Sequence, residues 1–205
     1  VRVDREWHTP LDAETEEALL ARIRELLPQV RGVVLSDYGS GTVTERVRRT
    51  VIAESRQRRI PSIVDARYDI LGYGGIGYVK QNDAELAAAV HRELPDEAAI
   101  IAAARELCAE LAADGVLVTR GEDGMTLVTR DGATTIPVTD RSEVFDVSGA
   151  GDTCVAAFIL ALAGGTSPLV AAQLSNIASG IAVRKFGTAT VSAAELTRKV
   201  RELFV

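Results

Sequence analysis

Residues 146–153 of the chain read DVSGAGDT, and the apolar run CVAAFILAL follows at once over residues 154–162. Two glycines around an alanine permit a tight turn, and the apolar run has the composition of a buried helix. The turn is therefore predicted to be a helix N-terminus. Backbone N–H groups at such an end are unpaired and carry partial positive charge. The segment from Gly149 to Gly151 is thus a candidate for binding an anion such as phosphate.

Asp152 falls in the first turn of this predicted helix, and two interpretations of it are open. A carboxylate at a helix N-terminus commonly does no more than interact favourably with the helix dipole. The same carboxylate, held beside an anion site, also has the placement that acid–base chemistry at a phosphoryl group requires. The unobstructed turn and the adjacent carboxylate together favour phosphoryl transfer over a simple cap.

The stretch DVSGAGDT resembles the C-terminal signature of the ribokinase-like, or PfkB, family of sugar kinases. The resemblance is greatest to the kinase domain of heptose-phosphate kinases and covers most of the chain. Further segments occur in the order and spacing of those kinases: residues 36–38 (SDY), Asn82 with Glu85, residues 118–120 (VTR) and residues 186–188 (FGT). The resemblance implies that Gly149, Ala150 and Gly151 form an anion hole for the transferred phosphate. It also implies that Asp152 is the base for the sugar hydroxyl.

The same resemblance implies ligands for ATP and for cations. The residues near ATP would be Thr119, Gly121, Asn176 and Ser179, with Arg67 on a phosphate where related kinases often have lysine. Asn82 and Glu85 would act through water on Mg²⁺ and the phosphates, and a hard cation that keeps several waters suits such an arrangement. Asp146 and Ser148 would help to bind a monovalent cation such as K⁺.

Several of these positions also have a plain structural interpretation, which the sequence leaves open. Asn82 with Glu85 three residues later is close to a capping box. Thr119 and Gly121 fit an ordinary hairpin, and Asn176 fits an exposed helix amide. Arg67 fits a solvent-exposed turn.

The chain also departs from the family pattern after its first predicted buried strand. Related kinases commonly have DYxKG where residues 37–41 read DYGSG, so any contact made by that lysine is missing. Asp37 itself has two interpretations. It stands beyond the carboxyl end of a strand, where ligands of open α/β sheets collect, but aspartate is equally common as a turn residue.

Composition agrees with a globular protein that acts on a small metabolite. The chain has 205 residues, 47% hydrophobic and 25% charged, which predicts one domain over residues 1–205. Its net charge of −6 argues against nucleic-acid or anionic-membrane partners. Cys108 and Cys154 lie in apolar helical patterns and are predicted to be reduced core residues, as in a cytoplasmic protein. A homodimer is left open.

The chain begins at Val1 and its single methionine is Met125. We therefore expect a kinase domain without its N-terminal portion, which in this family carries the Gly-Gly sugar-binding signature and the lid. Residues 2–6 resemble the strand that closes that portion. The expected activity is ATP-dependent phosphorylation of a sugar or sugar phosphate. The alternative is a non-catalytic nucleotide-binding or interaction module derived from a sugar kinase.

Hydrophobic periodicity and turn residues predict alternating strands and helices. The predicted strands cover residues 1–7, 32–36, 60–64, 115–119, 125–128 and 134–138, and residues 78–80 are predicted to be extended chain. The predicted helices cover residues 13–27, 44–59, 81–91, 96–113, 168–183 and 193–203, besides the one that begins at the glycine turn. Short apolar strands are typical of a parallel sheet, so we predict a three-layer α/β/α ribokinase-like fold. Residues 72–77 match G-x-G-x-x-G without the required strand and helix, and are predicted to be a flexible loop.

Overall fold

The computed structural model describes residue 3, residues 8–139 and residues 145–204. The predicted strand over residues 1–7 therefore falls almost entirely outside the described residues. In the part described, the predicted alternation of strands and helices is confirmed, with boundaries that differ by a few residues.

Within the described residues, six strands form one mixed sheet whose spatial order follows the chain. They are β1 (Val33–Asp37), β2 (Ser62–Ala66), β3 (Tyr78–Asn82), β4 (Gly115–Thr119), β5 (Met125–Thr129) and β6 (Gly132–Ile136). The first four strands pair in parallel, and β5 and β6 add two antiparallel pairings. The expected mostly parallel sheet is confirmed. Because parallel neighbours point the same way, the carboxyl ends of β1 to β4 share one edge of the sheet.

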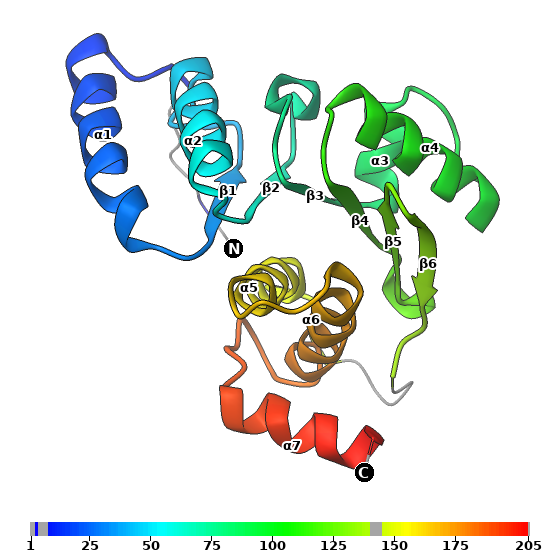
Figure 1. Cartoon of the computed structure of the whole chain (residues 1–205). Coiled ribbons are helices and arrows are strands. Elements are labelled where there is room, and N and C mark those ends of the chain that lie inside the picture. The colour runs from blue at the N-terminus through cyan, green and yellow to red at the C-terminus, as the bar shows by residue number, and fades with distance from the viewer. Residues whose placement is uncertain (1–2, 4–7, 140–144, 205) are drawn as a thin grey trace.

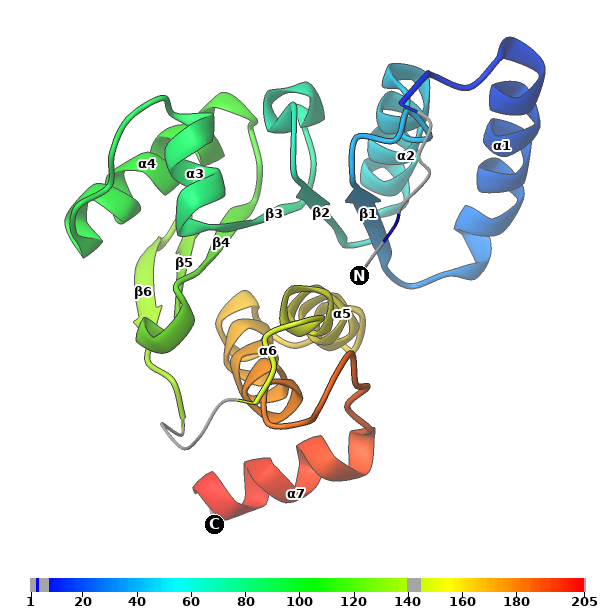
Figure 2. The ribbon, with the colours of Figure 1, turned by 180° about the vertical axis from the view of Figure 1, so that it is seen from behind.

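Helices cover both faces of this sheet, as Figures 1 and 2 show. One side carries α1 (Ala13–Leu26), α2 (Glu45–Arg58), α3 (Asp83–Ala89) and α4 (Glu97–Glu110). The other side carries α5 (Ala150–Ala163) and α6 (Pro168–Ala182), with α7 (Ala193–Phe204) lying outside α6. The arrangement is the predicted three-layer α/β/α fold. Among the described residues, no helix combines the length and apolar character needed to cross a bilayer.

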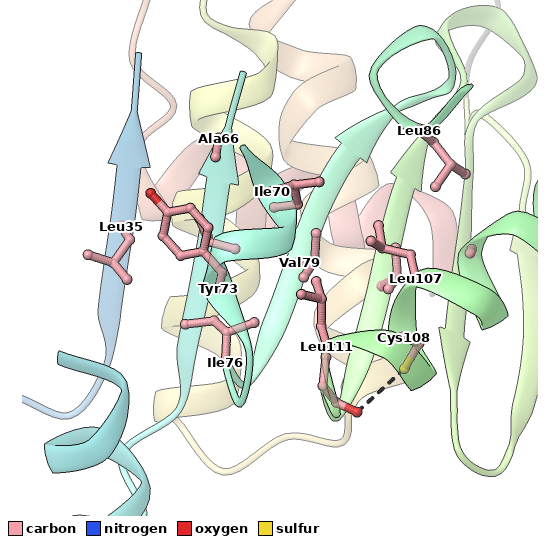
Figure 3. Close-up of a cluster of buried hydrophobic side chains, with 14 of the residues drawn as sticks. Leu35, Ala66, Ile70, Tyr73, Ile76, Val79, Leu86, Leu107, Cys108 and Leu111 are labelled. Carbon is pink, nitrogen blue, oxygen red and sulfur yellow. Dashed lines mark hydrogen bonds between the residues drawn. The ribbon is translucent and has the colours of Figure 1, made fainter. Parts of the chain in front are cut away.

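Two apolar cores hold the layers together. The larger one lies between the sheet and the helices of the first side, and Figure 3 shows part of it, including the fully buried Tyr73, Ile76 and Leu86. The smaller one lies between the sheet and α5 with α6. In it, the Phe158 ring of α5 packs edge-on against Tyr78 of β3, with ring centroids 5.1 Å apart. This packing fixes the position of α5, and therefore of its glycine turn, against the sheet.

Two sequence-based predictions need correction. We expected the first apolar strand to be buried on both faces, but among the described strands β1 lies at the end of the sheet, and Val34 is 41% exposed. An apolar run reports burial propensity and does not say which position in a sheet the strand takes. The segment over residues 72–77 is a loop as predicted, but it is anchored: Tyr73 and Ile76 are fully buried, and Arg56 donates hydrogen bonds to the carbonyls of Gly75 and Ile76.

Candidate active site

The N-terminus of α5 begins at the predicted glycine turn. Gly149 precedes the helix with a φ of 80° in the left-handed region, which glycine adopts without strain. No side chain caps this end, and a Cβ placed on Gly149 would meet nothing within 4 Å. The hydrogen bonds of the turn join Ala150 N to Val147 O and Thr153 N to Gly149 O. Among the described residues no carbonyl partner is recorded for the Gly151 and Asp152 amides, so the turn offers N–H groups to an anion.

Asp152 is exposed in the first turn of α5 and does not cap the helix. Its Oδ1 accepts a hydrogen bond of 3.3 Å from the hydroxyl of Tyr38, which follows β1. The place of Asp152 in the first turn still suits a favourable interaction with the helix dipole, so that interpretation stays open. A solvent-accessible carboxylate next to unpaired helix amides is also the arrangement expected of a general base beside an oxyanion site.

Lys80 of β3 is the main residue of the site that the sequence analysis missed. It is only 6% exposed, and its Nζ lies 3.3 Å from both carboxylate oxygens of Asp65 and 3.9 Å from Glu85. A Cβ placed on Gly151 would lie 3.2 Å from the same Nζ, so the ammonium group lies against the glycine turn. The available signal was a lysine inside an otherwise strand-like run, because a buried lysine is rarely left without a partner.

The charge of Lys80 and burial have opposite effects on the pKa of the neighbouring Asp65. Burial raises the pKa of Asp65 above its ordinary value, the ammonium of Lys80 opposes that rise, and the nearby Glu85 and Asp152 charges add to it. One cation and three carboxylates therefore share a small volume at the carboxyl ends of β2 and β3. A cation in a partly desolvated position of this kind interacts more strongly with an incoming anion than it would in water.

A pocket of about 550 Å³ extends from the glycine turn along α6 and the β4–β5 connection. Four of the five residues predicted to bind ATP line it, together with two residues of the predicted anion hole: Thr119, Gly121, Asn176, Ser179, Ala150 and Gly151. Apolar groups including Val138, Val147 and Val183 complete the wall. The pocket thus joins a mostly apolar surface to an anion-binding turn, which matches the two halves of a nucleotide.

Two α6 side chains in this pocket are fixed by hydrogen bonds. Asn176 is 6% exposed and donates to the carbonyl of Pro137 at 2.7 Å, so the alternative of an exposed helix amide is excluded. Ser179 donates to the carbonyl of Ala150 at 3.2 Å, which ties α6 to the first residue of α5. Both residues shape the pocket wall by holding neighbouring backbone in place.

The Asn82 and Glu85 pair forms a complete capping box at the start of α3. Asn82 Oδ1 accepts from Glu85 N at 2.7 Å, and Glu85 Oε2 accepts from Asn82 N at 2.8 Å. The structural interpretation is therefore correct, and it leaves Glu85 Oε1 outside the box. Among the described residues no cluster of three or more His, Cys, Asp or Glu side chains is arranged to hold a metal. This donor set fits a hydrated Mg²⁺ held mainly by water and phosphate oxygens.

The carboxylate of Asp146 binds the backbone just before the glycine turn. Its Oδ1 accepts from Ser148 N at 2.8 Å, and this bond, with a smaller contribution from the backbone of Gly187, holds the pKa of Asp146 below its ordinary value. The carboxylate is therefore ionised at neutral pH and lies close to the loop that follows α6. These are the features on which a monovalent cation would depend.

Asp37 and Arg67 lie at the other end of the site, away from the pocket lining. Both carboxylate oxygens of Asp37 are engaged, by Gly39 N at 2.8 Å and by the Tyr73 hydroxyl at 2.5 Å, so Asp37 has the role of a turn residue. Arg67 is exposed, and its guanidinium lies 5.2 Å from the centroid of the Tyr38 ring. It is the one predicted ATP-binding residue that does not line the pocket.

Comparison with known proteins identifies the family. Residues 7–195 match the model of the pfkB family carbohydrate kinases. The chain is 40% identical over 203 residues to the bifunctional protein HldE of Rhodospirillum rubrum and 42% identical over 202 residues to that of Acidiphilium cryptum. Each match covers 98% of this chain but 41% of the relative, so the chain spans about two fifths of the length of these curated relatives.

Solved structures of related fold agree with this assignment. Phosphofructokinase-2 from Escherichia coli in complex with potassium superposes with a TM-score of 0.81 at 24% identity, over 95% of this chain and 63% of that one. Arabidopsis thaliana ribokinase complexed with ribose and ATP gives a TM-score of 0.77 at 19% identity, over 95% and 61%. At such identities the likeness establishes the fold. Together with the family match and the relatives at 40% identity or more, it shows that the chain belongs to the pfkB family of carbohydrate kinases.

Proposed function

We propose that this chain carries the phosphotransfer site of a kinase that moves the γ-phosphoryl group of ATP to a hydroxyl of a sugar or sugar phosphate, most like the heptose-phosphate kinases. The observation that carries the proposal is the junction of the pocket with the glycine turn. The pocket is lined by residues that suit a nucleoside, and Gly151 is part of the same lining. The ammonium group of Lys80 lies against Gly151. A nucleotide in the pocket would present its phosphates to the turn and to Lys80.

Each group of the site then has a chemical task. The amides from Gly149 to Gly151 and Lys80 stabilise negative charge on the phosphoryl oxygens, and Asp152 accepts the proton of the attacking hydroxyl. Asn82 and Glu85 would hold Mg²⁺ through water, and the ion would supply charge neutralisation at the phosphates. Asp146 and Ser148 would hold a monovalent cation such as K⁺ near the turn. Arg67 binds an anionic group near Asp152.

Gly180 of α6 offers a direct test of the nucleotide site. It lines the pocket, and a Cβ there would come no closer than 3.9 Å to Thr139 Oγ1, so a larger side chain enters the pocket without backbone conflict. We expect the unmodified chain to bind Mg-ATP in calorimetry and the Gly180→Leu variant to bind at least about tenfold more weakly, since one buried side chain of misplaced volume costs about 1–3 kcal/mol.

Gln173→Leu is the matched control, because Gln173 is exposed on the same helix and receives the same new side chain outside the pocket. It should bind Mg-ATP like the unmodified chain. Equal binding by Gly180→Leu would contradict the nucleotide site. Release of ADP by the full-length protein that carries this chain is then measured with a panel of sugars and sugar phosphates. Binding of Mg-ATP without turnover of any of them by that protein would favour the non-catalytic nucleotide-binding module instead.

A further inference from the structure

The hydrogen bond between Tyr38 and Asp152 joins the two ends of the site across 114 residues of sequence. Tyr38 follows β1, and Asp152 belongs to α5, which covers the face of the sheet opposite to α1 and α2. Both side chains are exposed, with Tyr38 at 53%. A hydrogen bond between exposed groups contributes little to folding, so its main effect is on the direction of the carboxylate.

The backbone that carries Tyr38 is held tightly. The Asp37 carboxylate accepts from Gly39 N and from the hydroxyl of the fully buried Tyr73, and the Asp37 carbonyl accepts from Arg67 N at 3.1 Å. Figure 3 shows the Tyr73 ring between β1 and β2 with its hydroxyl toward the carboxyl end of β1. Gly39 has a φ of 73°, and a Cβ there would lie 2.8 Å from the Tyr68 ring. This turn therefore has little freedom to move Tyr38.

The ring of Tyr38 has a second constraint. The guanidinium of Arg67, which follows β2, lies 5.2 Å from its centroid, within the range of a cation–π interaction. The turn fixes the start of the side chain, the guanidinium holds the ring, and the hydroxyl meets Asp152. A tyrosine that served only to fill space would need neither the hydroxyl contact nor the cation.

We propose that Tyr38 is a positioning residue for Asp152. Its hydroxyl holds Oδ1 and leaves Oδ2 directed at the acceptor hydroxyl, with Arg67 and the Asp37 turn holding Tyr38 in place. The inference rests on the proposed function, because it assigns to Asp152 the proton of the acceptor. It accounts for a contact that neither nucleotide binding nor the folding of the two cores requires.

The first test measures the contact without any turnover. In the 205-residue chain labelled with ¹³C, the side-chain carboxyl resonance of Asp152 is assigned by its absence from Asp152→Asn. Loss of the hydroxyl in Tyr38→Phe is expected to move this resonance at neutral pH. Tyr68→Phe is the matched control: it removes the hydroxyl of a neighbouring exposed tyrosine and keeps the ring against Gly39. An unmoved Asp152 resonance in Tyr38→Phe would overturn the proposal.

The second test uses sugar phosphorylation by the full-length protein that carries this chain. Tyr38→Phe is expected to lower kcat about three- to tenfold, the size of one hydrogen bond, while the KM for Mg-ATP stays unchanged and Tyr68→Phe behaves as the unmodified chain. An unchanged kcat, or a change confined to the KM for Mg-ATP, would refute the positioning role. A full-length protein that phosphorylates no sugar would contradict the proposed function, whereas the resonance test would still decide whether Tyr38 holds the carboxylate.

Discussion

At the scale of single residues, the site combines groups with opposite requirements. Lys80 is buried, and its charge is acceptable there because Asp65 lies at 3.3 Å and Glu85 at 3.9 Å. Asp152 is exposed and accepts one hydrogen bond, so it remains accessible to a substrate hydroxyl. A buried cation for the phosphoryl oxygens and an exposed base for the proton are the two groups that the proposed transfer needs.

Replacement of Asp152 by asparagine tests the base directly. Asp152→Asn keeps the shape of the side chain and removes its basicity, so in the full-length protein kcat for sugar phosphorylation should fall by about 10² to 10⁴. Mg-ATP binding measured by calorimetry should change little, because the pocket and the turn are retained. Asp131→Asn, in the exposed β5–β6 turn, should leave both quantities unchanged. An Asp152→Asn chain with normal kcat would eliminate Asp152 as the base.

At the scale of secondary-structure elements, the glycine turn depends on how α5 packs. The helix is apolar along most of its length, and Cys154, Val155, Phe158 and Ile159 are its buried residues. Phe158 is fully buried against Tyr78 of β3, the strand that also carries Lys80. The contact between these two rings therefore holds the helix that bears Asp152 against the strand that bears Lys80.

Truncation of Phe158 should show how much this packing stabilises the protein. Phe158→Ala is expected to lower the free energy of unfolding in urea by about 3–5 kcal/mol, because it removes buried apolar area and leaves a cavity. Leu160→Ala on the same helix is the control, since Leu160 is 70% exposed, and it should change the free energy by no more than about 0.5 kcal/mol. Similar small losses in both variants would show that α5 is not anchored through Phe158.

At the scale of the whole molecule, α7 packs on the outer side of α6, away from the sheet. None of its described residues is buried, so polar contacts contribute much of its attachment. Glu195 accepts hydrogen bonds from Lys185 and from both the amide and the hydroxyl of Ser192. These contacts lower the pKa of Glu195 from its ordinary 4.5 to about 2, and the hydrogen bond from Lys185 contributes most.

The lowered pKa predicts how the stability depends on pH. A carboxylate whose pKa is depressed by folding stabilises the protein above its unfolded-state pKa, and that contribution is lost as the pH falls through the folded-state pKa. Glu195→Gln should therefore lower the Tm at pH 7, and the difference from the unmodified chain should shrink as the pH falls from about 4.5 toward about 2. Glu202→Gln, with an exposed ion pair on the same helix, should have little effect at pH 7. A Tm difference for Glu195→Gln that is independent of pH would refute the assignment.

The sequence by itself determined the features that depend on neighbouring residues. The glycine turn and the helix after it, the capping box at Asn82, and the short apolar strands are all where the pattern placed them, with shifts of a few residues at their ends. Glycine conformations, helix caps and hydrophobic periodicity depend on residues that are close in sequence, so they can be predicted from the sequence alone. The resemblance of DVSGAGDT to a kinase signature added the family, which the comparisons confirm.

Only the tertiary structure decided which of these residues meet. It placed β1 at the end of the described strands, brought Lys80 against Gly151 and joined Tyr38 to Asp152. It also assembled the pocket from segments around residues 119–125, 138–139, 147–151 and 176–184. It also separated Arg67 from the pocket that the other predicted ATP-binding residues line. The physical reason is that such contacts depend on strand order and on the packing of α5 and α6 against the sheet. Local sequence patterns set the elements, whereas burial of two apolar cores sets their arrangement.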